Sequence, residues 1–217
     1  MEIKVLKDIL SANDGLANKN QGRLKAQGIL TINVMASPGA GKTSLLLQTI
    51  DRLKETVRLA VIEGDIASTI DADKISKQGV RAVQINTAGG CHLDANMIEQ
   101  ALNNLPLEDL DLLFIENVGN LVCPAEFSLG EDKKVMVFSL PEGDDKPYKY
   151  PLMFSQTDVI LINKIDLLSH LDFDIDTFIK TVSGLNPKAK ILQVSCKTGQ
   201  GLEDWVAWLK NEIEGIK

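Results

Sequence analysis

The chain has 217 residues, a length suited to a single compact domain with one hydrophobic core. Its formal net charge is −7 and it has no run of Lys and Arg, so we do not expect nucleic acid as a partner. No apolar stretch approaches the ~20 residues that cross a bilayer, and the charged start MEIKVLKDIL lacks the apolar block of a signal peptide, so we expect a cytoplasmic protein without membrane contacts.

The first 28 residues are predicted to form a helical arm ahead of the main domain. Polar sequence from Asn13 to Gly28 follows a set of apolar residues with helical spacing, namely Ile3, Leu6, Ile9 and Leu10. We therefore expect an arm over residues 1–28 and a main domain over residues 29–217, in a chain that folds as a single domain overall.

Beyond the arm, short apolar runs alternate with segments of helical length. The runs predict seven strands, at 29–35, 58–62, 80–85, 112–115, 135–138, 159–162 and 191–194. Helices are expected at 43–56, 94–105, 174–185 and 201–214. The runs are almost continuously apolar, which is typical of strands that are covered on both faces. The fold class is therefore predicted to be α/β, with a doubly wound, mainly parallel seven-stranded sheet and helices on both faces.

Residues 36–43, with the sequence ASPGAGKT, form a phosphate-binding loop between the first predicted strand and a helix. Backbone N–H groups of such a loop surround phosphate oxygens, Lys42 can reach the β- and γ-phosphates, and the Thr43 hydroxyl can bind Mg²⁺. The alternative is a chance glycine turn, which the preceding strand and following helix argue against. The nucleotide-binding residues predicted here are Ser37, Pro38, Gly39, Ala40, Gly41, Lys42, Thr43 and Ser44.

Residues 163–166, with the sequence NKID, follow the strand predicted at 159–162, at the sheet edge where ligands of such folds bind. The Asp166 carboxylate can accept from N1–H and from the 2-amino group of guanine, donors that adenine lacks, so guanine is the expected base. A solvated loop is the alternative. The base site is predicted to consist of Asn163, Lys164 and Asp166, with a second contact from Ser195, Cys196 and Lys197.

Acidic residues end two further predicted strands, in the sequences EGD at 63–65 and ENVG at 116–119. Asp65 and Glu116 are expected to bind Mg²⁺ together with Thr43, and Asp65 is preferred for positioning the attacking water, which makes Lys42 and Asp65 the predicted catalytic residues. The Gly119 backbone is expected to contact the γ-phosphate. Solvated carboxylates at strand ends are the alternative.

Two segments at the same sheet edge carry Cys91-His92 and Cys123. Thiolate and imidazole together suit Zn²⁺ or Ni²⁺, and we expect a cysteine at a helix start to have a lowered pKa. Three ligands leave a fourth position for water, a second subunit or a delivery partner. Taken separately, each cysteine also fits a small buried thiol, and His92 also fits a surface imidazole. We keep the surface interpretation for His170.

Four motifs together resemble one family: EGDIA at 63–67, GCHLD at 90–94, ENVGNLVCP at 116–124 and NKID at 163–166. They are similar to the HypB family, GTPases of the SIMIBI class of P-loop proteins that act in hydrogenase maturation, and the resemblance spans about residues 1–215.

The resemblance implies a GTPase that binds GTP or GDP with Mg²⁺, helps to insert nickel into [NiFe]-hydrogenase and folds as a SIMIBI domain over residues 29–217. It implies a homodimer around nucleotide, with Cys91, His92 and Cys123 near the interface, and two partners, the nickel-binding maturation protein HypA and the hydrogenase large subunit. Two alternatives stay open. One is a urease-type nickel accessory GTPase such as UreG, and the other is a metal-binding scaffold with a structural nucleotide site.

Overall fold

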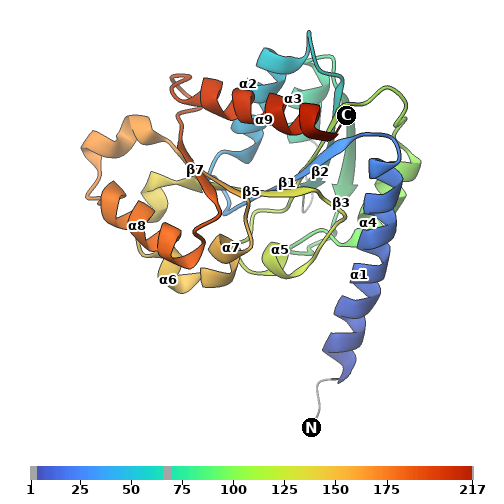
Figure 1. The fold of residues 1–217 in the computed structure, drawn as a ribbon, viewed down its shortest axis with the longest axis horizontal. Coiled ribbons are helices and arrows are strands. Elements are labelled where there is room, and N and C mark those ends of the chain that lie inside the picture. The colour runs from blue at the N-terminus through green and yellow to red at the C-terminus, as the bar shows by residue number, and fades with distance from the viewer. Residues whose placement is uncertain (1–3, 66–69, 217) are drawn as a thin grey trace.

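The structure is a computed structural model that describes residues 4–65 and 70–216, and its centre is a parallel sheet (Figure 1). In chain order the strands are β1 (Leu30–Ala36), β2 (Leu59–Asp65), β3 (Arg81–Asn86), β4 (Leu112–Glu116), β5 (Lys133–Ser139), β6 (Val159–Asn163) and β7 (Lys190–Gln193). Their order across the sheet is β3-β2-β4-β1-β5-β6-β7, and every neighbouring pair is parallel. The predicted seven-stranded doubly wound sheet is confirmed.

Nine α-helices surround the sheet within the described residues. They are α1 (Lys4–Lys25), α2 (Lys42–Leu53), α3 (Ile70–Ser76), α4 (Ala95–Asn103), α5 (Cys123–Glu126), α6 (Lys146–Lys149), α7 (Pro151–Ser155), α8 (Ile175–Leu185) and α9 (Leu202–Ile216), with 3₁₀ helices η1 (Leu140–Glu142) and η2 (Ile165–His170). The predicted helices correspond to α2, α4, α8 and α9. The short helices from α5 to α7 were not predicted, because four or five residues are too few to show helical periodicity.

The helices form two layers around the sheet. In Figure 1, α2, α3 and α9 lie on one side of the strands, and α1, α4, α7 and α8 lie on the other. Because both faces are covered, β1 and β4 are buried along their whole length, whereas the edge strands β3 and β7 are only partly buried. This explains the nearly continuous apolar runs in the sequence. No helix in the described ranges is long and apolar enough to cross a membrane.

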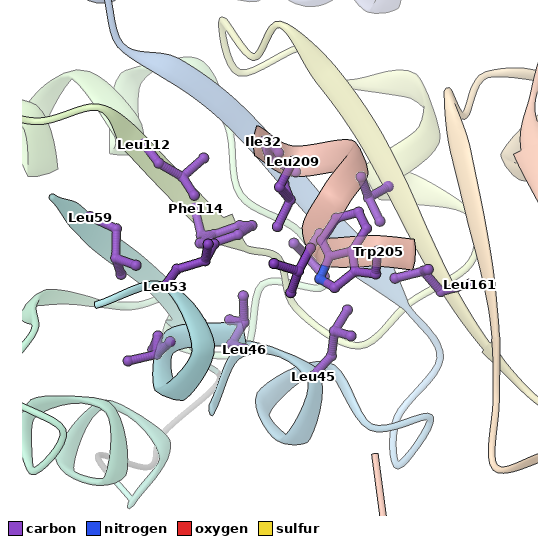
Figure 2. Close-up of a cluster of buried hydrophobic side chains, with 14 of the residues drawn as sticks. Ile32, Leu45, Leu46, Leu53, Leu59, Leu112, Phe114, Leu161, Trp205 and Leu209 are labelled. Carbon is purple, nitrogen blue, oxygen red and sulfur yellow. The ribbon is translucent and has the colours of Figure 1, made fainter. Parts of the chain in front are cut away.

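The core between α2, α9 and the sheet is built around Trp205 and Phe114, which are fully buried (Figure 2). The indole N–H of Trp205 donates to Thr49 Oγ1 at 2.9 Å, so the one polar atom of this large side chain is satisfied inside the core. Helix α2 is thereby fixed at two places: its first turn by the phosphate-binding loop, and Thr49 by α9. A rigid α2 matters because its N-terminus borders the candidate site.

The predicted N-terminal arm is a helix, α1, but it is partly integrated into the core. Ala17 and Leu24 are buried on one side of α1, and Leu24 joins the cluster formed by α4 and β4. Figure 1 shows α1 running alongside α4, with its N-terminal end projecting past the rest of the molecule. Ile3 of the predicted helical pattern lies outside the described residues. The domain division at residue 28 stays a prediction.

Candidate functional site

The phosphate-binding loop connects the end of β1 to the start of α2 as predicted. Two glycines in it adopt left-handed backbone conformations, Gly39 with φ 74° and Gly41 with φ 107°. A Cβ atom at Gly41 would lie 2.5 Å from Asn163 Nδ2, so only glycine fits at this close approach. The loop and the first turn of α2 border a cavity of 460 Å³, a size suited to phosphate groups and a metal ion.

The cavity brings together three sequence segments that were predicted to meet there. Its lining includes 63–65 at the end of β2 and 116–119 at the end of β4, together with Lys42 and Thr43. Burial lowers the pKa of Lys42, although nearby carboxylates partly oppose the shift. Sequence reasoning included Glu63 in the 63–65 motif without giving it a role of its own, and it did not name Asp71 or Lys74, which also line this cavity.

Glu63 and Glu116 are register partners on β2 and β4, and both are almost fully buried beside the cavity. The Thr43 hydroxyl donates to Glu116 Oε1 at 2.8 Å. Within the described residues, the second carboxylate oxygen of each glutamate is buried without a hydrogen-bond partner. Burial raises the pKa of Glu63 to about 8, with the neighbouring Glu116 adding to the shift, and burial raises the pKa of Glu116 to about 7. Unpartnered carboxylate oxygens beside Thr43 fit the hard cation Mg²⁺.

Asp65 and Gly119 lie at the cavity as well. Asp65 is half-buried at the end of β2, and its backbone oxygen accepts from Thr87 N at 2.9 Å. A Cβ atom at Gly119 would lie 3.0 Å from the backbone of Pro38, so the 116–119 segment packs directly on the phosphate-binding loop. The geometry is compatible with the roles predicted for Asp65 and Gly119, which stay predictions.

The NKID segment is attached to the phosphate-binding loop by two hydrogen bonds. Asn163 Nδ2 donates to Ala40 O at 3.0 Å, and Lys164 Nζ donates to Gly39 O at 2.7 Å. Lys164 itself has a positive φ of 63°, which turns the chain sharply after β6. These contacts place the two predicted nucleotide-binding segments side by side, as is needed for one nucleotide to contact both.

Next to them lies a second cavity of 300 Å³, which Gly41 and Ser44 share with the first cavity. Its other lining residues are five from the predicted base-binding segments, Asn163, Lys164, Asp166, Cys196 and Lys197, together with Leu167, which was not predicted. Asp166 is held in place because Ser195 Oγ donates to its Oδ1 at 2.6 Å. The fully buried Ser195 thus supports Asp166 in this structure and is not part of the cavity lining.

Cys196 also lines the second cavity, and its backbone N–H donates to Asn163 Oδ1 at 3.2 Å. Burial raises the pKa of its thiol to about 11, so the thiol stays protonated at neutral pH. A protonated, partly buried thiol is suited to packing against a ligand and poorly suited to binding a metal. The position of Cys196 beside Asn163 is compatible with the base contact predicted for it, which stays a prediction.

The structure brings Cys91, His92 and Cys123 together, with ligand atoms that all lie within 4.8 Å of one another. The two sulfur atoms are 3.2 Å apart, and Cys91 Sγ is 3.6 Å from His92 Nδ1. Cys91 precedes α4 and Cys123 begins α5, so the cluster joins two segments that are distant in sequence. Two thiols and one imidazole at these distances fit a single Zn²⁺ or Ni²⁺ ion.

The protonation states of the cluster differ in part from expectation. Burial lowers the pKa of His92, whose ring packs on Phe127 with centroids 4.1 Å apart, so the imidazole is neutral as a metal ligand must be. The pKa of Cys123, however, is raised, first by the hydrogen bond with the Cys91 thiol and then by burial. The expectation of a lowered pKa at a helix start is wrong for Cys123, because α5 is a four-residue helix and the adjacent thiol outweighs its N–H groups.

Known proteins are similar to this chain over most of its length. The family described as CobW/HypB/UreG, nucleotide-binding domain, matches residues 30–193. Similar relatives include hydrogenase maturation factor HypB of Rhizobium leguminosarum bv. viciae, 51% identical over 96% of this chain and 70% of the relative, and that of Escherichia coli (strain K12), 48% identical over 98% and 72%. The crystal structure of HypB from Helicobacter pylori in complex with nickel superposes with a TM-score of 0.90 at 39% identity, covering 94% of this chain and 96% of that chain.

Proposed function

This chain belongs to the HypB family of hydrogenase maturation factors, and from that premise we propose that it is a magnesium-dependent GTPase that delivers nickel to [NiFe]-hydrogenase. The observation that carries the proposal is the position of the Cys91–His92–Cys123 cluster directly beside the end of a nucleotide-site segment. Only three residues separate Cys123 from Gly119, which packs on the phosphate-binding loop. A metal site and a nucleotide site this close can influence each other.

Nucleotide chemistry is supported by the two adjoining cavities. The larger one offers Lys42 for the β- and γ-phosphates and Thr43 with Glu116 for Mg²⁺, and Asp65 borders the position where an attacking water would lie. The smaller one presents Asp166, held by Ser195, to a base. A carboxylate here favours guanine, because adenine lacks the two donors that it accepts from.

Nickel is proposed as the cargo of the Cys/His cluster, and zinc fits the same ligands. Cys91 is exposed, so the cluster opens to solvent, and three protein ligands leave a further position for water, a second copy of the chain or a delivery partner. An incomplete, accessible site suits transfer better than permanent storage. The proposed partners, by family, are a second copy of this chain, the nickel-binding protein HypA and the hydrogenase large subunit.

The proposed coupling runs through residues 116–119. When GTP and Mg²⁺ bind, these residues are ordered against the phosphates, and Cys123 moves with them, so that metal affinity or dimerisation differs between the GTP and GDP states. A coupling of ~1–3 kcal/mol would change metal affinity several-fold to about a hundredfold. By linkage, bound metal changes nucleotide affinity by the same factor.

A GTP hydrolysis assay on the wild-type protein and Lys42→Ala tests the enzyme against a scaffold with a structural nucleotide site. We expect turnover in the wild type and a loss of about 100-fold or more in Lys42→Ala, because the lysine stabilises charge that develops on the phosphates. Lys54→Ala, an exposed lysine at the opposite end of α2, is the matched control. Absence of GTP turnover in the wild type would leave the scaffold as the better interpretation.

The urease-type accessory GTPase shares the phosphate and base sites, so hydrolysis does not separate it from this proposal. The distinguishing feature is the adjacent pair Cys91-His92 together with Cys123. Binding assays with purified hydrogenase and urease maturation factors decide between them, and selective binding of urease factors would favour the alternative.

A further inference from the structure

Helix α1 bridges the two segments that carry the Cys/His cluster. We infer that α1 sets the geometry of this cluster, with Asn13 and Asn20 as positioning residues, an inference that rests on the proposed metal-binding function. Neither asparagine lies at a cluster atom or in either nucleotide cavity. Each one, however, forms hydrogen bonds with both cluster segments.

The first bridge is Asn13. Its Oδ1 accepts from the backbone N–H of Ala95 at 2.9 Å, and its Nδ2 donates to Ser128 O at 2.8 Å. Ala95 begins α4 three residues after His92, and Ser128 follows Cys123 by five residues. A single side chain thus connects the backbone beside one half of the cluster to the backbone beside the other half.

The second bridge is Asn20, two helical turns further along α1. Its Nδ2 donates to Ala95 O at 2.8 Å and to Leu129 O at 3.3 Å. The residue is only 2% exposed and Asn13 only 7% exposed. If the two segments moved apart, the buried asparagine amides and the backbone groups that they bond would lose their partners, which costs free energy. These hydrogen bonds therefore strongly favour one separation between the two segments.

The seam between α1 and residues 128–131 is also closely packed. Gly130 has φ 99°, and a Cβ atom there would lie 2.7 Å from Ala17 O and 2.8 Å from the Asn20 side chain. The backbone at Gly130 therefore lies directly on α1, against the stretch from Ala17 to Gln21. Any larger residue would push this loop, and Cys123 with it, away from the helix.

The same loop is held from its other side. Glu131 Oε2 accepts from Leu129 N at 2.7 Å, and Glu131 Oε1 accepts from Asn33 Nδ2 on β1 at 3.3 Å. Residues 128–131 are thus fixed between the central strand and α1, whereas α4 is fixed to α1 by Ala95. Helix α1 thus joins the Cys91–His92 segment to the Cys123 segment. It does so in addition to the direct bonds between them, in which Asn120 Nδ2 donates to Cys91 O at 3.3 Å and the Leu93 N–H donates to Asn117 Oδ1 at 3.1 Å.

Metal titration of full-length variants tests the inference. Ni²⁺ alone, followed by nickel–thiolate absorbance, is titrated into the wild type, Asn13→Ala, Asn20→Ala and Asn18→Ala, the last an exposed asparagine on the same helix. We expect Asn13→Ala and Asn20→Ala to bind Ni²⁺ roughly 10-fold or more weakly, as for residues that orient metal ligands, with Asn18→Ala equal to wild type. GDP affinity, measured on the same samples, should stay within about twofold.

A second variant reaches the same seam from the loop. Gly130→Ala keeps the sequence of α1 as it is and adds a Cβ atom on the loop side of the contact. We expect it to weaken Ni²⁺ binding as the asparagine variants do, while GDP affinity is retained. Equal Ni²⁺ affinity in wild type and the Asn13, Asn20 and Gly130 variants would overturn the inference and leave the proposed function standing. Parallel losses of Ni²⁺ and GDP affinity would also overturn it, since they indicate general loss of structure. A wild type that binds no Ni²⁺ or Zn²⁺ would overturn the proposed metal function, and this inference with it.

Discussion

The backbone N–H of Leu93 donates to the side-chain oxygen of Asn117 at 3.1 Å. Leu93 directly follows His92 of the metal cluster, and Asn117 directly follows Glu116 of the nucleotide site. The Leu93 side chain also packs over Gly64, the residue between Glu63 and Asp65. A Cβ atom at Gly64 would lie 2.8 Å from the Leu93 side chain. The segment that carries the Cys/His cluster therefore contacts both acidic strand ends of the larger cavity, which gives the proposed coupling a physical path.

Asn117→Ala should uncouple the two sites. Asn117 is fully buried and also donates to Asn33 Oδ1 at 3.2 Å, so its loss frees the Leu93 N–H and loosens the 116–119 segment. We expect the ratio of Ni²⁺ affinities measured with GDP and with a nonhydrolysable GTP analogue to move toward one, from a several-fold or larger ratio in the wild type. Competition titrations with a metal chelator in each nucleotide state measure this ratio.

Asn104→Ala is the control for this experiment, because Asn104 is exposed and its side chain donates to the nearby Gln100 O. It should keep the wild-type ratio. If Asn117→Ala also keeps it, the bond between Leu93 and Asn117 does not transmit the nucleotide state, and the chain connection from Gly119 to Cys123 is the path that remains.

Asp166→Ala should remove guanine selectivity. The carboxylate is expected to accept two hydrogen bonds from guanine, and its loss also leaves the buried Ser195 hydroxyl without its 2.6 Å partner. Hydrogen bonds to a charged group contribute about 1.5–3 kcal/mol each, so GTP affinity should fall by about 100-fold or more, with little change for ATP. Calorimetry with both nucleotides measures the difference. Asp172→Ala, at an exposed position nearby, should bind as wild type does, and unchanged GTP affinity in Asp166→Ala would place the base elsewhere.

The buried glutamates predict a stability that falls with pH in protein free of nucleotide and metal. The native state raises the pKa of Glu63 from 4.5 to about 8, first through burial and then through Glu116. Between these values the folded protein binds more protons than the unfolded chain, so the free energy of unfolding decreases as pH rises from about 5 to about 8. Glu63→Gln should flatten this dependence and stabilise the protein at pH 8 by on the order of 3 kcal/mol.

Chemical denaturation at pH 5 and pH 8 measures this effect. Glu55→Gln, an exposed glutamate beyond the C-terminal end of α2, should follow the wild-type profile. Saturating Mg²⁺ and GDP should weaken the pH dependence, because a bound cation favours the ionised carboxylates. A wild type whose stability rises between pH 5 and pH 8 would contradict the assignment of these carboxyl groups as buried and protonated.

Much of this protein is predictable from the sequence because its motifs are local. The apolar strands can be recognised from short runs of neighbouring residues. The phosphate-binding loop and the NKID segment directly follow two of these strands, so their spacing alone places them at strand ends of a parallel sheet. The short helices α5 to α7 are different. Their few residues are helical because of the surrounding packing, which periodicity does not record.

The sequence by itself determined the fold class, predicted the nucleotide-binding segments and supplied the residue types of the Cys/His cluster. Only the tertiary structure decided that Ser195 supports Asp166, that Cys91 and Cys123 face each other at 3.2 Å, and that Glu63 shares the cavity with Glu116. It alone showed that Asn13 and Asn20 of α1 connect the segments that follow the two halves of the cluster. The physical reason is that these relationships join residues tens of positions apart, through burial and hydrogen bonds that exist only once the sheet has assembled.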